Sequence, residues 1–286
     1  MKYIRLILVL VSLGLLSVSC DRDLPYPIDQ TINSVVVDVY PVDGSDKVLS
    51  AGEVKGNYKA QISIPTQQGD YSMLDKVQLL GVFQDNQGNI TSKILQDDIG
   101  DLPVVLNIDI EKIYNEFGKV SPDFGEILYL TANVVLKGGK IIPGWTEYTG
   151  FNNRAFTGWQ VDNRAYSYNV RYPVVCPLVL EEFEGTLNVD DGSEVYKVNG
   201  KKVSETTIEL VGIQGSKVPV PVVIDPSDHT VTIPKTILAP SFGQYHNLFI
   251  EGKGTIDMCN GKITFVGDLG VDEGYFLIDN QWTISN

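Results

Sequence analysis

Short apolar runs rich in β-branched and aromatic side chains recur along most of this 286-residue chain, and clusters of Gly, Asp, Asn and Pro separate them. Runs of strand length that are punctuated by turn residues are typical of β-sandwiches and β-barrels. We therefore predict an all-β protein, whose clearest strands are residues 34–40, 58–64, 76–83, 127–136 and 207–213.

One segment, residues 109–118, has the apolar spacing of an amphipathic helix instead. Asp109 or Asn107 can cap its first turn, and Gly118 can end it. Its apolar face would consist of Ile110, Ile113, Tyr114 and Phe117. A single short helix in a β-rich chain predicts a crossover between edge strands.

A domain boundary is indicated where the aromatic-rich stretch ends near Tyr172 and two prolines, Pro173 and Pro177, bracket Cys176. We predict an Ig-like β-sandwich over residues 34–175, which includes the crossover helix. A second β-domain, sandwich or barrel-like, would occupy residues 176–286. Both segments have the length of common domains.

The first 19 residues have the parts of an export signal: Lys2 and Arg5, an apolar run over residues 6–16, and small residues before Cys20. A cysteine at the cleavage position predicts a bacterial lipoprotein signal peptide, with Cys20 as the lipidated first residue and residues 20–33 as a tether. The apolar run is too short for a membrane span, which takes roughly 20 residues. The alternative is a plain secretory signal with an incidental cysteine.

The mature chain would be strongly acidic. It would carry 20 basic residues, after loss of Lys2 and Arg5, against 36 acidic ones, a net charge of −16. Such a body repels phosphate backbones and anionic headgroups, so we expect no nucleic-acid partner and membrane contact through the lipid anchor only. The content of 43% hydrophobic and 20% charged residues is that of a packed globular protein.

With Cys20 acylated, Cys176 and Cys259 are the remaining cysteines of an exported protein, and we predict that they form a disulfide. Two buried free thiols are the alternative. No metal site or cofactor is expected, because neither cysteine belongs to a CxxC motif and His229 and His246 stand alone in the sequence.

The sequence carries no GxSxG, HExxH or phosphate-loop motif, so no catalytic residue is predicted. Glu181, Glu182 and Glu184 could supply the acid and base of a glycosidase, but strand alternation would place Glu182 and Glu184 on one solvated face. The acidic residues around Gly192 could bind calcium, yet a DDG sequence between strands first indicates a hairpin turn.

Residues 143–172 combine aromatic rings with asparagine and arginine side chains. Ring faces edged by amide and guanidinium donors are what a glycan or peptide site needs. Trp145, Tyr148 and Trp159 are the best candidates for ligand binding, because Gly and Asn neighbours suggest exposed loops. The alternative is that these rings fill the core or a domain junction.

Several segments of the chain form a recognisable layout: the strand-helix-strand run LPVVLNIDIEKIYNEFG to EILYLTANVVLKGGK, then CPLVLEEFEGTLNV, DMCNGKITF and the closing QWTISN. This layout resembles Bacteroidetes surface lipoproteins of the SusE-like kind, which accompany SusC/SusD-type outer-membrane pairs. The long aromatic insert and the lipobox LLSVSC depart from the family pattern.

This resemblance implies a noncatalytic accessory or ligand-binding component of TonB-dependent nutrient uptake, acting on glycans or peptides. Asp21 and Asp23 resemble the Bacteroidetes signal for export to the outer face of the outer membrane, whereas in enteric bacteria an aspartate after the cysteine resembles an inner-membrane retention signal. A structural or adhesive surface protein without a small ligand, or a hydrolase without a recognisable motif, are the alternative functions.

Overall fold

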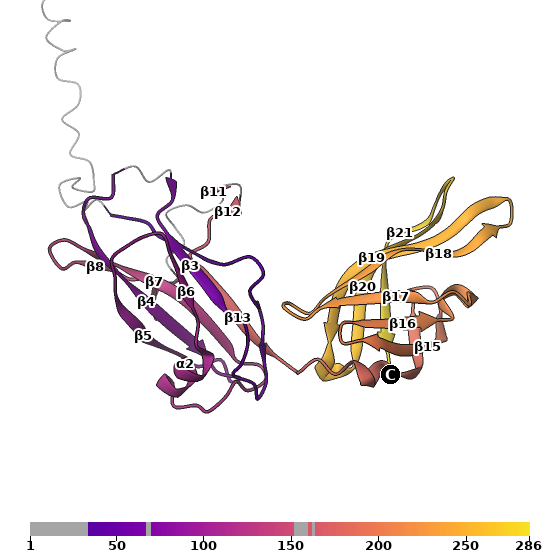
Figure 1. Ribbon diagram of the computed structural model, residues 1–286, viewed down its shortest axis with the longest axis horizontal. Coiled ribbons are helices and arrows are strands. Elements are labelled where there is room, and N and C mark those ends of the chain that lie inside the picture. The colour runs from indigo at the N-terminus through magenta and orange to yellow at the C-terminus, as the bar shows by residue number, and fades with distance from the viewer. Residues whose placement is uncertain (1–33, 67–69, 152–159, 162–163) are drawn as a thin grey trace, which may run out of the picture. The chain divides into compact units, whose positions relative to one another are not determined.

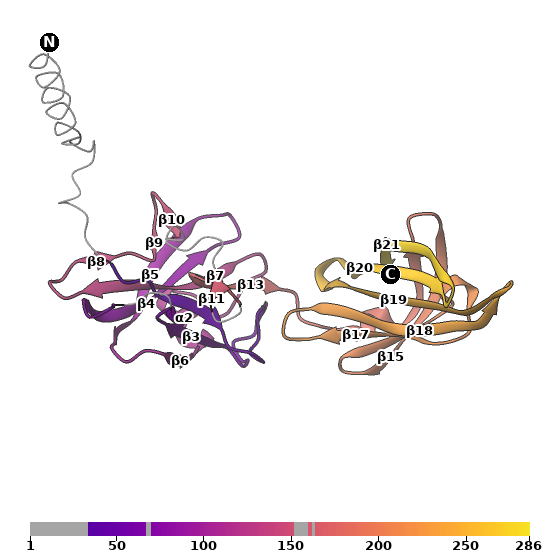
Figure 2. The same ribbon diagram turned by 90° about the horizontal axis from the view of Figure 1, so that it is seen from above.

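The computed structural model describes residues 34–66, 70–151, 160–161 and 164–286, and over these residues the protein is all-β, as the sequence predicts (Figures 1 and 2). The predicted signal peptide, lipidated Cys20 and the whole predicted tether, residues 20–33, lie outside the described residues.

The first part is built from two main sheets. The smaller sheet has the order β1-β3-β6, and the larger has the order β2-β13-β7-β4-β5 with β8 paired to β7. Their strands are β1 (Asp38–Pro41), β3 (Lys59–Ser63), β6 (Val104–Asn107), β2 (Leu49–Ser50), β13 (Asn169–Val175), β7 (Ile127–Leu136), β4 (Leu74–Gln84), β5 (Ile90–Ile99) and β8 (Ile141–Ile142).

The two sheets share one hydrophobic cluster, to which Val39 and Ile62 contribute from the smaller sheet and Val77 and Leu130 from the larger. This is the packing of a β-sandwich. Strands β4 and β7 are buried over nearly continuous runs, unlike half-exposed strands that alternate. The face of the larger sheet that points away from the smaller one must therefore be covered as well.

Helix α2 (Ile110–Glu116) begins as predicted, because the side chain of Asp109 accepts a 3.0 Å hydrogen bond from the backbone N–H of Lys112. Gly118 follows with φ of 75°, a left-handed conformation that suits glycine. The helix connects β6, an edge strand of the smaller sheet, to β7. Because β7 lies inside the larger sheet, the expectation that the helix joins two edge strands is wrong. No helix among the described residues is long and apolar enough to cross a membrane.

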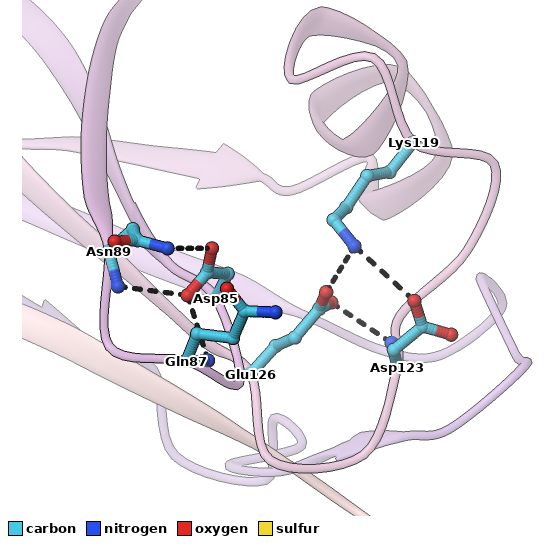
Figure 3. A network of polar contacts seen from close by, with 6 residues as sticks. All are labelled: Asp85, Gln87, Asn89, Lys119, Asp123 and Glu126. Carbon is cyan, nitrogen blue, oxygen red and sulfur yellow. Dashed lines mark hydrogen bonds and ion pairs between the residues drawn. The ribbon is translucent and has the colours of Figure 1, made fainter.

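A buried carboxylate fixes the loop between α2 and β7 (Figure 3). Glu126 accepts a 2.9 Å hydrogen bond from the backbone N–H of Asp123 and pairs with the ammonium group of Lys119, which also lies 3.3 Å from the Asp123 carboxylate. Beside it, Asp85 closes the β4–β5 turn by accepting from the backbone N–H groups of Gln87 and Asn89. The contacts of Glu126 compensate the burial of its carboxylate, which would otherwise be destabilising.

The second part is a closed barrel in which every neighbouring pair of strands is antiparallel. Closure leaves the barrel without a free sheet edge where its strands are paired. In order around the barrel, the strands are β14 (Gly185–Asp190), β15 (Val195–Ser204), β16 (Thr207–Val211), β17 (Val220–Asp225), β18 (Thr230–Phe242), β19 (Tyr245–Asp257), β20 (Lys262–Val271) and β21 (Gly274–Ser285).

Side chains fill the barrel interior. The fully buried Trp282 stacks on Phe265 with ring centroids 5.6 Å apart and planes 11° apart. Gly254 on β19 is opposite Phe265, and a Cβ atom there would lie 2.6 Å from the Cβ atom of Phe265. Glycine is therefore required at residue 254 for this ring to pack across the strands.

A disulfide joins Cys176, just before the barrel, to Cys259 in the short 3₁₀ helix η5 (Met258–Asn260) between β19 and β20. The two Cα atoms are 5.4 Å apart, and the cysteines are 83 positions apart in the sequence. Cys176 also packs against the barrel core. The bridge thus holds the entry segment of the barrel to a turn at the far end of the sequence.

Removal of this bridge should destabilise the barrel, because it frees the unfolded chain from a long closed loop, which is worth roughly 4 to 5 kcal/mol in chain-entropy estimates. We expect reductant to lower the melting temperature, and Cys259→Ser to do the same without reductant. The Cys176→Ser/Cys259→Ser variant is the control, and it should not respond to reductant. Equal melting curves for the oxidised protein and this double variant would contradict the prediction.

Candidate functional site

The predicted aromatic segment begins as a small hairpin on the outer face of the larger sheet. Strand β9 (Trp145–Thr146) pairs with β10 (Gly150–Phe151), and Tyr148 lies in the turn between them. Trp145 is half-buried, whereas Tyr148 is 96% exposed. Trp159, the third predicted ligand-binding residue, lies outside the described residues.

Buried polar groups hold this hairpin in place. The backbone N–H of Gly144 donates a 2.9 Å hydrogen bond to the side-chain oxygen of Asn133, whose amide nitrogen donates to Gln78 at 3.1 Å. A Cβ atom at residue 144 would lie 2.4 Å from the carbonyl oxygen of Ala132, so only glycine fits there. The start of the predicted segment is therefore fixed by the sheet beneath it.

Other rings of the segment pack against protein. Phe151 contacts Tyr129 of β7 and Tyr168, with centroid distances of 5.0 and 6.1 Å, and Tyr172 is completely buried. Phe151 thus covers Tyr129 on the outer face of β7, whereas Tyr172 fills the core between the two sheets and packs on Tyr58. Part of the segment thus has the packing role that the sequence left open as the alternative.

An arginine from the same segment makes a two-pronged contact with a buried carboxylate of the sandwich. Arg164, in the short strand β12 (Arg164–Ala165) that pairs with β11 (Gln160–Val161), reaches Asp38 with both terminal nitrogens, one of them at 3.2 Å from Oδ1. Asp38 is fully buried and also accepts a 3.0 Å hydrogen bond from the backbone N–H of Ser167. A buried carboxylate requires such a partner.

The guanidinium group also stacks on the ring of Tyr40, with its central carbon 3.4 Å from the ring centroid. Burial lowers the pKa of Arg164, but the hydrogen bond to Asp38, the attraction between the two charges and the contact with Tyr40 together outweigh it, so the net shift of this pKa is upward. Arg164 stays charged and Asp38 neutralises it. Tyr40 is consequently held in one orientation by a planar cation on one face.

Tyr40 lines a cleft with a volume of about 360 Å³, which we call the tyrosine cleft. Tyr71, 53% exposed, contributes a second ring. The remaining lining residues are Gln61, Ser63, Ile64, Pro65, Thr66, Leu102 and Pro103. Strands β1 and β3 therefore supply part of the cleft, and the segments that follow β3 and precede β6 supply the rest.

None of the described lining residues is charged, although the chain as a whole is strongly acidic. Two tyrosine rings offer apolar faces. Gln61, Ser63 and Thr66 add an amide and two hydroxyl groups, which are chemical groups that both donate and accept hydrogen bonds. Polar and apolar surface contribute about equally to the lining, and a ligand that combines C–H faces with hydroxyl groups needs both kinds. The chemistry suits an uncharged ligand with several hydroxyl groups.

The sequence analysis missed the tyrosine cleft because its two rings come from separate segments. Tyr71 follows Asp70 in a turn-rich stretch between two predicted strands, and that position could have indicated an exposed ring. Tyr40 gave no such signal, because it ends an apolar strand whose other residues are core.

The acidic candidates have structural roles. Residues Leu180–Phe183 form the 3₁₀ helix η3, so the expected strand alternation there is wrong, and Glu181 instead pairs with Lys202 at 2.7 Å.

Buried Asp191 accepts from the backbone N–H groups of Ser193 and Glu194, both at 2.9 Å, within the β14–β15 turn. Burial raises its pKa, but the hydrogen bonds outweigh this and the net shift is downward. The described residues contain no group of three or more His, Cys, Asp or Glu that could hold a metal ion.

Comparison of the chain with protein-family models, with curated proteins and with solved structures finds no match.

The pairing of Asp38 and Arg164 gives a direct test of how the site is held. Arg164→Met should lower the free energy of unfolding by about 2 to 4 kcal/mol, because it leaves a buried carboxylate without its cation. Asp38→Asn in the same background should restore part of the loss, since a neutral amide needs no countercharge. Urea denaturation measures both, with exposed Arg171→Met as the control. A loss no larger than that of the control would show that the pair does not stabilise the sandwich.

Proposed function

We propose that this chain is a noncatalytic lipoprotein of the SusE-like kind, lipid-anchored through Cys20 in the outer membrane and facing the cell exterior. It works beside a SusC/SusD-type pair in TonB-dependent nutrient uptake, and it binds an uncharged glycan in the tyrosine cleft. The lipoprotein signal and the acidic residues after Cys20 support the location, and the family resemblance supports the partners.

The observation that carries the ligand is the composition and rigidity of the tyrosine cleft. Sugar rings present C–H faces that pack on tyrosine, and their hydroxyl groups pair with amide and hydroxyl side chains. The Arg164–Asp38 pair orients Tyr40 before any ligand arrives, which reduces the entropy lost on binding. An anionic ligand would find no unpaired cation among the described lining residues.

The same composition supports a binding role over hydrolysis of a glycan in this cleft. Glycosidases place two carboxyl groups on either side of the scissile bond. The described residues that line the tyrosine cleft include no aspartate or glutamate. Capture without cleavage is what these side chains can perform.

Tyr71→Ala should weaken glycan binding by about thirtyfold, which corresponds to about 2 kcal/mol for a dominant aromatic contact. The melting temperature should hardly change, because Tyr71 is more than half exposed. Isothermal titration calorimetry against a panel of neutral oligosaccharides and uncharged peptides would measure the effect.

Two further variants make that experiment decisive. Phe124→Ala removes an exposed ring outside the tyrosine cleft and should leave affinity unchanged. Tyr148→Ala tests the hairpin predicted from the sequence. If it, rather than Tyr71→Ala, abolishes binding, the ligand lies on the outer face of the larger sheet. If wild type binds peptides and no oligosaccharide, the glycan assignment is wrong.

Anchoring through Cys20 is tested separately. Cys20→Ala should leave the protein unprocessed or released, because acyl chains hold a protein on the bilayer by burying methylenes at about 0.8 kcal/mol each. Labelling with a fatty-acid analogue, followed by fractionation of outer membranes and protease treatment of intact cells, would measure lipidation and orientation. Wild-type protein that incorporates no label would refute the anchor.

A further inference from the structure

Two hairpins of the barrel extend beyond their neighbouring strands (Figure 1). Strand β17 pairs with β18 only at Thr230–Thr232 of β18, and β14 pairs with β21 only at Thr283–Ser285 of β21. The remaining lengths of the β18–β19 and β20–β21 hairpins pair with each other through β19 and β20. They form a four-stranded projection outside the closed part of the barrel.

Four aromatic residues gather near the end of this projection, and we call them the tip cluster: Phe242, Tyr245, Tyr275 and Phe276. Phe276 contacts Phe242 at 5.4 Å and Tyr245 at 6.0 Å between ring centroids. Their exposed fractions are 52%, 37%, 54% and 45% in sequence order. Phe276 thus joins Phe242 and Tyr245, while Tyr275 contacts Phe249 instead. Large rings that are more than a third exposed favour an interaction surface over a core.

The tip cluster rests on a rigid base. Tyr275 packs edge-on against the buried Phe249, and the ammonium group of Lys235 lies 3.7 Å from the centroid of the Phe249 ring. The turn before β21 is tied to β19, because His246 pairs with Glu273 at 2.5 Å and Asn247 donates to Asp272 at 2.7 Å. Register shifts in β21 near Tyr275 and Leu277 add residues to one strand, and such bulges re-aim side chains.

Acidic side chains prevail at the end of the projection. The turn before β21 carries Asp272 and Glu273, and residues 242–249 and 268–279 contain no lysine or arginine. His246 is paired with Glu273, and the ammonium group of Lys235 lies over the ring of the buried Phe249. An anionic membrane surface would be repelled, and a second copy would bring like charges together. The rings of Phe242 and Tyr245 stand at 64° and 73° to Phe276, so the cluster offers no flat platform for a sugar chain. The tip cluster is best complemented by a protein partner that has an apolar recess with lysine and arginine at its rim.

We infer that the tip cluster is the surface by which this chain docks on its protein partner, inserting Phe242 and Phe276 into an apolar recess rimmed by lysine and arginine. The inference rests on the proposed function, which supplies a SusC/SusD-type outer-membrane pair as that partner. Aromatic residues dominate the energy of protein interfaces, and charged rims chiefly steer association. The tyrosine cleft belongs to a different set of strands, so docking and glycan capture use different residues.

The test measures affinity of the full lipidated chain in detergent for the purified SusC/SusD-type pair of the same organism in nanodiscs. The Phe242→Ser/Phe276→Ser variant should raise Kd tenfold or more, while Phe124→Ser, which removes another exposed phenylalanine, should not. Asp272→Lys/Glu273→Lys should weaken association without touching a ring, and wild-type association should weaken as salt rises. If the double serine variant has a lowered melting temperature, the Asp272→Lys/Glu273→Lys variant still tests the inference, because it leaves the rings in place.

Each contrary result has a distinct meaning. If wild type fails to bind the pair, the partner and the docking inference both fall, while oligosaccharide titration still decides the tyrosine cleft. If both tip variants bind as tightly as wild type, only the docking inference falls. Binding of wild type to empty nanodiscs that the variants lose would identify a membrane occupant. A wild-type dimer that the variants dissolve would identify a second copy, and oligosaccharide affinity lost in the tip variants alone would identify a glycan. Each of these last three results overturns the inference.

Discussion

The carboxylate of Asp38 is fully buried in the first strand of the sandwich, and the candidate ligand site depends on how this charge is compensated. Arg164, far along the chain, provides the compensation, and in doing so it brings the end of the aromatic segment back against β1. The hydroxyl group of Tyr166 donates to the carbonyl of Val37 at 2.9 Å and extends the same contact. One buried charge thereby sets the orientation of Tyr40, which lines the tyrosine cleft.

A different constraint governs the barrel, where strands of unequal length are closed into one sheet. Strands β14, β16 and β17 have five or six residues, whereas β18 and β19 have 13 each. The extra length cannot pair with the short neighbours, so it continues as hairpins that pair with each other. Their inner contacts are satisfied by Phe249 and its neighbours, and the rings left over face solvent as the tip cluster.

These two surfaces use electrostatics in opposite ways. The tyrosine cleft is lined by uncharged residues in an acidic chain, so it selects for shape and hydroxyl groups, and ligand binding there should depend little on salt. The tip cluster lies next to Asp272 and Glu273 in the sequence, so the proposed partner would be selected partly by charge. In the proposed function, glycan capture and docking therefore use different residues.

The sequence by itself determined the features that depend on residues close together in the chain: the strands, the helix and the turns. Alternation and turn residues indicated the strands, the Asp109 cap and Gly118 placed the helix, and turn chemistry explained the DDG sequence. Where a local pattern was ambiguous, as in residues 180–184, the interpretation as a strand was wrong, because the burial of Leu180 and Phe183 fits a 3₁₀ turn as well. Local spacing cannot separate those two structures over four residues.

Only the tertiary structure decided which rings are exposed together. Tyr129, Phe151 and Tyr172 look as available in the sequence as Tyr40 and Tyr71, yet the former cover a sheet or fill the core and the latter line a cleft. Phe242 and Phe276 meet because two hairpins outgrow the barrel, which requires the lengths and pairing of all its strands. Exposure depends on what distant segments cover, and sheet pairing brings those segments together through contacts that no local sequence window contains.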